Sequence, residues 1–261
     1  MSFFTVGGYI GFAIGPLLAT PLLLAFGLRG IAWLMLPALL VAVLLVRALP
    51  HFNEVRRTAH LARRVLAGEN DVRGFSVMAI VVALRSTTFL AAVTFTPVFA
   101  MRVLGVNPFL QSVTLFALLA GGAAGTMLGG LLGDRIDRRR VITLSLALTA
   151  LAGFAIAWSG EVLHVFAVLA VLAPLFGVAL GLSAGVLVVL GQEYLPKNIG
   201  IASGVTLGLA NTIGGIAAPI FGHIGDAFGM VSLFLTIAFF ALLAMLGSLA
   251  MPKPSSVSSR A

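Results

Sequence analysis

An arginine inside an apolar segment is the residue of this sequence with the clearest chemical implication. Arg85 lies in the run VMAIVVALRSTTFLAAV, which holds no other charge. A charge near the centre of a bilayer costs on the order of 3 kcal/mol on insertion scales, so it normally faces a polar cavity and a partner. A guanidinium group is a planar, bidentate donor for phosphate or phosphonate oxygens. We predict that Arg85 binds an anionic group or pairs with a carboxylate; alternatively, its side chain extends to the nearer membrane interface.

Three further polar residues lie within or near apolar segments: Gln111, Asn211 and His223. Each could line a polar path through the membrane or hydrogen-bond to a neighbouring helix. The structural role is favoured for Gln111 and both roles stay open for Asn211. We take Arg85, Gln111 and Asn211 as the candidate substrate-binding residues.

Acidic residues are missing from the middle of every apolar segment. Proton-coupled exchange usually needs an embedded titratable group, and His223 is the one candidate, so a coupling carboxylate is expected outside these segments. Glu193 and Asp226 lie at segment ends, where we expect solvated or helix-capping roles.

A serine-hydrolase pattern, G-x-S-x-G, occurs at residues 181–185 with Ser183 at its centre. A hydrolase would need Ser183 within hydrogen-bond distance of a base such as His223, and the soluble motif needs a strand, a turn and a helix. Because the pentapeptide lies inside one apolar helical segment, we interpret the match as accidental and expect no enzyme. The sequence shows no metal-ligand cluster or phosphate-binding loop, so we expect no cofactor and no metal.

The elements that position these residues follow from the composition. Sixty per cent of the chain is hydrophobic and 9% is charged, against roughly 25% charged in a soluble domain. The chain has 30 Gly, without collagen periodicity, and no Cys, which excludes collagen and disulfide-scaffold classes as well as disordered chains. The sequence therefore predicts an integral membrane protein.

The membrane-spanning segments are expected to be α-helices, because lipid leaves no partner for unpaired backbone groups. A span needs about 20 apolar residues. Eight segments qualify, approximately 3–26, 30–49, 74–101, 109–132, 141–158, 163–191, 199–225 and 231–251. The prediction is an all-α protein with eight transmembrane helices.

Basic residues alternate between the two ends of these spans. They lie between spans two and three (Arg47, Arg56, Arg57, Arg63, Arg64, Arg73), four and five (Arg135, Arg138, Arg139, Arg140), six and seven (Lys197), and after span eight (Lys253, Arg260). The other connections hold Arg29 and Arg102. The positive-inside rule places the Arg-rich loops and both termini in the cytoplasm. The net charge of +8 is therefore read as an orientation signal, and no nucleic-acid partner is expected.

Residues 50–73 form the longest basic connection. Phe52, Val55, Ala59, Ala62 and Leu66 recur at helical spacing, which favours a helix lying in the membrane interface; a solvated linker is the alternative.

Small residues recur at helical spacing in two spans. Gly121, Gly125 and Gly129 are spaced by four, as are Gly177, Gly181 and Gly185. Such stripes allow helices to approach closely, so packing is the favoured role.

A weak internal repeat has an offset of about 201 residues. Ser2, Thr5 and Gly7 recur as Ser203, Thr206 and Gly208, which pairs span one with span seven and suggests a six-span repeat. Four spans are then expected to be missing from the front.

Two motifs resemble a known family, the major facilitator superfamily (MFS). The run from Gly130 to Arg139 is similar to its cytoplasmic G-x-L-A-D-R-x-G-R-K loop, with Asp137 in place of Gly. Gly11, Gly15 and Pro16 fit the G-x-x-x-G-P element of its drug antiporters, in the fifth of twelve spans, although Ala19 and Thr20 replace the trailing glycines. The runs VGGYIGFAIGPLL and ALRSTTFLAAVTFTPVF resemble the fosmidomycin-resistance type of efflux protein.

The resemblance implies a partial MFS fold, spans five to twelve, in a bacterial inner membrane. Residues 1–49 would complete the N-terminal half, 50–73 link the halves, 74–251 form the C-terminal half and 252–261 a disordered cytoplasmic tail. Gly130, Asp134, Arg135, Arg138 and Arg139 would form a conformational gate. The implied function is proton-driven efflux of a small, anionic or phosphonate-like drug or metabolite. Its partners would be substrate, protons and the bilayer, and a separate chain could supply the missing helices. Uptake of a sugar or organic anion, and an inactive fragment, remain alternatives.

Overall fold

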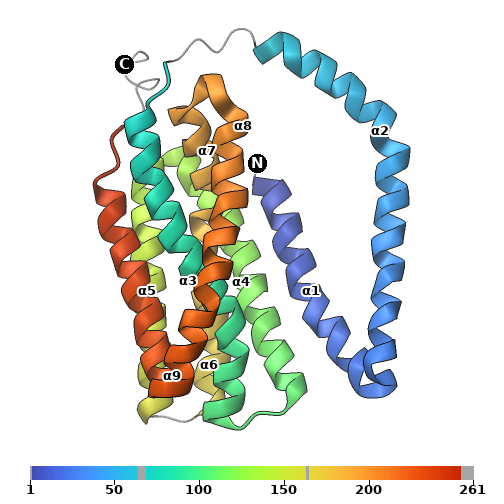
Figure 1. Cartoon of the computed structure of the whole chain (residues 1–261), viewed down its shortest axis with the longest axis vertical. Helices are drawn as coiled ribbons and strands as arrows, with labels where there is room; N and C mark the ends of the chain where they lie inside the picture. The colour runs from blue at the N-terminus through green and yellow to red at the C-terminus, as the bar shows by residue number, and fades with distance from the viewer. Residues whose placement is uncertain (1, 64–68, 163–164, 254–261) are drawn as a thin grey trace.

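The chain folds into a bundle of long helices, with two helices set to one side (Figure 1). The computed structural model describes residues 2–63, 69–162 and 165–253. Within these ranges the chain is almost entirely helical and contains no strand. The all-α class predicted from the sequence is therefore confirmed for the described residues.

The helices follow one another with short connections. In chain order they are α1 (Ser2–Phe26), the 3-10 helix η1 (Gly27–Leu34), α2 (Met35–Arg63), α3 (Val72–Leu104), α4 (Pro108–Arg135), α5 (Arg138–Val162), α6 (Phe166–Leu182), α7 (Ala184–Tyr194), η2 (Pro196–Asn198), α8 (Ile199–Ser203), the π-helix η3 (Gly204–Leu209) and α9 (Ala210–Leu249). Local signals fix several ends: the side chains of Asp71 and Asn107 cap α3 and α4, and Gly105 ends α3 in the left-handed region.

Six continuous helical stretches in the described residues are long and apolar enough to cross a membrane. Two of them contain a break at which one predicted span ends and the next begins. The stretch Gly7–Leu49 is interrupted by η1, where Gly27 has a φ of 61°. The stretch Pro196–Leu249 is interrupted at Gly229, whose φ of 88° and ψ of 164° are not helical. The chain reverses at both breaks (Figure 1), which fall between predicted spans one and two and spans seven and eight.

Helices α3, α4, α5, α6 and α9 enclose the core, which consists of two apolar clusters. One contains Phe99, Phe176 and Phe234, and the other, toward the opposite end of α3, contains Met78 and Tyr194. Helix α1 packs along α4, whereas α2 packs on η1 and stands apart from the bundle (Figure 1). The predicted connection 50–73 is helical as far as Arg63, and its residues 64–68 lie outside the described residues. Most of the predicted tail, residues 254–261, also lies outside them.

The glycine stripes form a direct backbone contact between α4 and α6. A Cβ built on Gly125 would lie 2.2 Å from the carbonyl oxygen of Val178, and one on Gly129 would lie 1.9 Å from that of Leu182. In the opposite direction, a Cβ on Gly181 would lie 2.1 Å from the carbonyl oxygen of Gly122. These approaches leave no room for a side chain, so the packing role is confirmed at Gly121, Gly125, Gly129, Gly177 and Gly181.

Candidate functional site

The side chain of Arg85 crosses from α3 to the junction of α6 and α7. Its Nε donates a hydrogen bond to Ser183 Oγ at 2.9 Å, and its Nη2 donates one to the Leu180 carbonyl at 2.8 Å. The guanidinium carbon also lies 5.8 Å from the centre of the Phe89 ring. The guanidinium group is therefore held inside the bundle by α6.

Ser183 lies at a break in the helix, because α6 ends at Leu182 and α7 begins at Ala184. Its hydroxyl is 2.9 Å from that of Ser145 on α5, and Ser145 Oγ lies 2.6 Å from the Ala179 carbonyl. Each hydroxyl carries a single proton. Ser183 Oγ therefore accepts from Arg85, and the single proton of Ser145 is directed to Ser183 Oγ or to the Ala179 carbonyl.

This position of Ser183 differs from the sequence interpretation, which placed the G-x-S-x-G pentapeptide inside one helix. The serine is fully buried and its hydroxyl contacts Arg85 and Ser145, whereas His223 is exposed. Among the described residues, no hydrogen bond joins Ser183 to a histidine. A serine nucleophile needs a base that takes its proton, and this arrangement does not supply one.

The polar contacts of Arg85 separate the two apolar clusters of the core. On α3, the buried residues of one cluster end at Val82 and those of the other begin at Ala91, with the partly buried Leu84 and Phe89 packed against them. Arg85 is half-buried in this layer and has no acidic partner among the described residues. A guanidinium group has five N–H donors, and the two hydrogen bonds in this layer use two of them. The remaining donors and the uncompensated charge suit an anion.

An aromatic side chain from α1 borders this site. The ring of Tyr9, 8% exposed, packs edge-on against Phe89 with ring centres 5.8 Å apart. It also covers Gly122 of α4, where a Cβ would lie 2.6 Å from the Tyr9 ring. Sequence reasoning missed Tyr9, because an aromatic residue in an apolar helix gives no signal of its own.

The other two candidate substrate-binding residues lie elsewhere. The Nε2 of Gln111, on α4, is buried without a hydrogen-bond partner among the described residues, and the adjacent Ser112 hydroxyl bonds to Thr20 of α1 at 2.5 Å. Asn211 is exposed just after the π-helix η3, and its Nδ2 donates to the Leu207 carbonyl at 2.8 Å. In the described part of the chain, no hydrogen bond connects either residue to Arg85.

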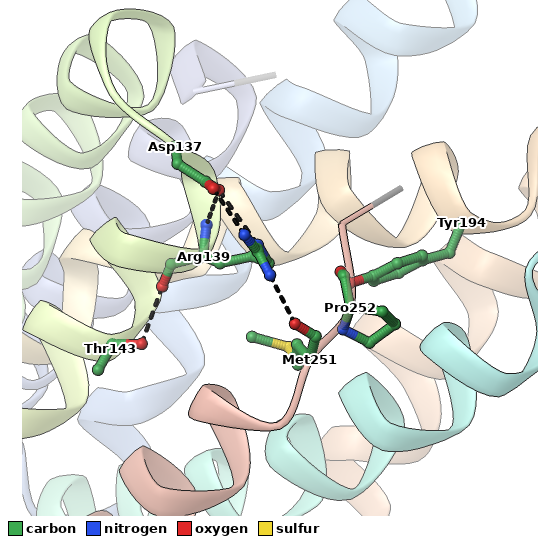
Figure 2. A network of polar contacts seen from close by, with 6 residues as sticks. All are labelled: Asp137, Arg139, Thr143, Tyr194, Met251 and Pro252. Atoms are coloured by element: carbon green, nitrogen blue, oxygen red, sulfur yellow. Dashed lines mark hydrogen bonds and ion pairs between the residues drawn. The ribbon is translucent and has the colours of Figure 1, made fainter. Parts of the chain in front are cut away.

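A second group of polar contacts ties together the ends of α5, α7 and α9 (Figure 2). The Arg139 guanidinium is paired with Asp137 at 2.9 Å and donates to the Met251 carbonyl at 2.7 Å. The Tyr194 hydroxyl donates to the Pro252 carbonyl, and Arg138 pairs with Glu193. Of the predicted gate residues, Arg138 and Arg139 thus link helices. Asp134 and Arg135 are exposed and make no ion pair with a described residue, and Gly130 lies within α4.

Asp137, which replaces a glycine of the family motif, has a role in this group. Its carboxylate accepts a hydrogen bond from the Arg139 backbone N–H at 3.0 Å, at the beginning of α5. The hydrogen bonds from the Arg139 side chain hold the pKa of Asp137 below its usual value, despite partial burial.

The structure adds an ion pair to the solvated roles expected for Glu193 and Asp226, whose side chains are 26% and 65% exposed. Each pairs with an arginine on another helix: Glu193 with Arg138 of α5, and Asp226 with Arg102 of α3 at 2.6 Å. The partners lie far apart in the sequence, so spacing alone gave no indication of either pair.

The antiporter-type residues Gly11, Gly15 and Pro16 lie within α1. A Cβ on Gly11 or Gly15 would meet nothing within 4 Å, so neither glycine makes a close backbone contact with another described helix. Across the described residues there is also no group of three or more His, Cys, Asp or Glu side chains that could hold a metal ion.

Comparisons with known proteins agree with this architecture. Residues 1–219 and 113–261 each match the model of the Major Facilitator Superfamily. The Fosmidomycin resistance protein of Escherichia coli (strain K12) is 31% identical over 251 residues, which cover 94% of this chain and 60% of the relative. The Uncharacterized MFS-type transporter YfnC of Bacillus subtilis (strain 168) is 34% identical over 258 residues, which cover 95% of this chain and 61% of the relative.

The chain thus spans about three fifths of the length of these curated relatives. The similarity to the fosmidomycin-resistance type, first seen in two short runs, extends over nearly the whole chain. The family matches, the two relatives and the apolar helices together show that this chain belongs to the major facilitator superfamily of membrane transporters.

Proposed function

We propose that this chain is part of an efflux transporter that exports a small anionic compound, such as a phosphonate, from the bacterial cytoplasm. The uncompensated guanidinium group of Arg85 carries this proposal. The name of the Escherichia coli relative, Fosmidomycin resistance protein, supports efflux of a drug. Because the chain covers 60% of that relative, the activity of the whole transporter, its substrate and its partners are part of the proposal.

The proposed binding step follows from the donors of Arg85. An oxyanion that approaches the guanidinium finds unused N–H groups, and binding it neutralises a charge that the apolar clusters leave poorly solvated. Bidentate pairing of this kind favours a planar or tetrahedral oxyanion over a neutral molecule. Gln111 and Asn211 are proposed as more distant polar residues of the same path.

The proposed topology has eight spans, with both termini and the Arg-rich loops in the cytoplasm. The breaks at η1 and Gly229 support this count, since each divides a stretch that is long enough for two crossings. In this orientation the Arg138–Glu193 and Arg139–Met251 contacts lie at the cytoplasmic ends of the helices. They would form when that end is closed and separate when it opens.

Coupling to protons requires a titratable side chain, and we propose that it is not one of the residues of the bundle core. Asp226 and Glu193 are engaged in ion pairs at helix ends, and His223 is exposed. We propose that the coupling carboxylate belongs to another part of the transporter, within the same polypeptide or a partner chain.

Binding of fosmidomycin, a phosphonate, to the purified chain tests the role of Arg85. Isothermal titration calorimetry should show at least about tenfold weaker binding for Arg85→Ala, because a hydrogen bond to a charged group contributes about 1.5–3 kcal/mol. Arg85→Lys should be intermediate, since it retains the charge and loses the fork. Arg29→Gln, which removes an exposed arginine on η1, should bind as the wild type does.

Accumulation of labelled fosmidomycin in cells then tests the direction of transport. Cells that express the chain should accumulate less than control cells if it contributes to export. Increased accumulation would support uptake, and wild-type binding by Arg85→Ala would remove Arg85 from the substrate site.

A further inference from the structure

A cleft opens between α5 and the C-terminal arm of α9, residues 230–249. It lies on the side of the bundle away from α1 and α2 (Figure 1). Its volume is about 440 Å³, and its lining residues are Arg139, Arg140, Thr143, Leu144, Ala147, Ser248 and Leu249. The described partners of Arg85, which are Ser183, Leu180 and Phe89, do not line this cleft, so it is separate from the proposed substrate site.

The polar end of the cleft offers one cationic group that the fold leaves unused. Arg139 is occupied by Asp137 and by the Met251 carbonyl (Figure 2). The Thr143 and Ser248 hydroxyls lie 2.8 Å apart and also bond to backbone carbonyls. The side chain of Arg140 is exposed and makes no hydrogen bond or ion pair with a described residue. Arg140 is therefore the group at this end that can bind an anion.

The rest of the cleft is apolar and continuous with an exposed leucine surface. Leu144 and Leu249 are 45% and 65% exposed. Further along the same faces, Leu148 and Leu151 of α5 and Leu246 of α9 are also exposed. In a membrane protein, such a surface faces acyl chains. Ala147, which has a small side chain, lines the cleft between α5 and α9.

We propose that this cleft binds one anionic glycerophospholipid, with the phosphate of its headgroup on Arg140 and the start of an acyl chain along Leu144, Ala147 and Leu249. The lining is cationic at one end and apolar along the rest, which favours a lipid over a soluble phosphate. A soluble phosphate would bind Arg140 and leave the leucines uncovered. The positive charge of Arg140, which no described acidic residue neutralises, favours an anionic headgroup over a zwitterionic one. The bound lipid joins α5 to α9 beside the Arg139–Met251 contact.

Native mass spectrometry of the purified full chain, titrated with dioleoylphosphatidylglycerol or dioleoylphosphatidylcholine, tests this site. The wild type should retain one phosphatidylglycerol more tightly than phosphatidylcholine. Arg140→Gln should weaken phosphatidylglycerol binding about fivefold, which corresponds to the ~1 kcal/mol per basic residue near an anionic surface, and leave phosphatidylcholine unchanged. Arg73→Gln, which removes an exposed arginine of α3 outside the cleft, is the matched control and should change neither.

Two further arms separate a lipid site from other occupants. Ala147→Leu fills the apolar part without changing the charge and should weaken phosphatidylglycerol binding while Arg140 remains in place. Excess inorganic phosphate should not displace the lipid. Equal losses in Arg140→Gln and Arg73→Gln, an unaltered affinity in Ala147→Leu, or displacement by inorganic phosphate would each overturn the proposal.

Discussion

The contact between α4 and α6 predicts opposite effects for the same substitution at two kinds of glycine. In Gly125→Ala, the new Cβ would lie 2.2 Å from the Val178 carbonyl oxygen, whereas ordinary contact begins at 3.4 Å. The two helices must therefore separate by about 1 Å, because backbone atoms cannot rotate away as a side chain can. Overpacking of this kind costs typically about 1–3 kcal/mol.

Gly11→Ala is the matched control. A Cβ at Gly11 meets nothing within 4 Å, so the substitution should stabilise the chain by about 0.5–1 kcal/mol through helix propensity. Unfolding of both variants in mixed micelles, followed by far-ultraviolet circular dichroism against the fraction of denaturing detergent, measures the difference. We expect Gly125→Ala to unfold earlier than the wild type and Gly11→Ala to unfold at the same point or later. Equal midpoints for the two variants would refute the interpretation that backbone contact at the glycines holds α4 against α6.

Two further predictions concern the contacts at the ends of α5 and α7. A double-mutant cycle with Arg138→Gln and Glu193→Gln, measured by unfolding, should give a coupling free energy of up to about 1 kcal/mol, because the ion pair is partly shielded from solvent but not buried. A coupling free energy of zero would show that this ion pair does not hold the helices together. Asp137 has a lowered pKa in the folded chain, so its ionised form stabilises the fold. This stabilisation should be complete above the ordinary Asp pKa of about 4, and it should be lost as the pH falls through the lowered pKa. The difference in unfolding free energy between the wild type and Asp137→Asn should thus be constant near neutral pH and shrink in acid; a difference that grows in acid would contradict the assigned cause.

Periodic and compositional features of the sequence predicted the parts of this structure that depend on one helix at a time. The apolar runs correspond to the membrane-capable helices, and the Gly121–Gly129 and Gly177–Gly181 spacings predicted a close helix contact. The loop motif beginning at Gly130 predicted the family. Each of these signals is local, because a helix repeats its faces every three to four residues.

Contacts between helices were not predictable, because they depend on the relative register of elements that are far apart in the chain. Nothing near Arg85 indicates that Ser183 and the Leu180 carbonyl are its partners. Gly181 and Gly185 flank the break at Ser183, but their spacing predicted a packing stripe on one continuous helix. The pairing of Asp226 with Arg102 likewise joins residues 124 positions apart. Sequence reasoning therefore identified Arg85 as a site residue without identifying its surroundings.

The two polar groups that the sequence indicated separately are connected by one short helix. Ser183, immediately before α7, accepts a hydrogen bond from Arg85, and Glu193 and Tyr194, at the end of α7, bind Arg138 and the Pro252 carbonyl. α7 has 11 residues and is about 16 Å long at a rise of 1.5 Å per residue. Its first end lies at the interruption of the α-helix at Ser183, and its second end is bound to α5 and to the segment after α9. An anion that binds the unused Arg85 donors, as proposed, would therefore lie beside Ser183, at the interruption between α6 and α7.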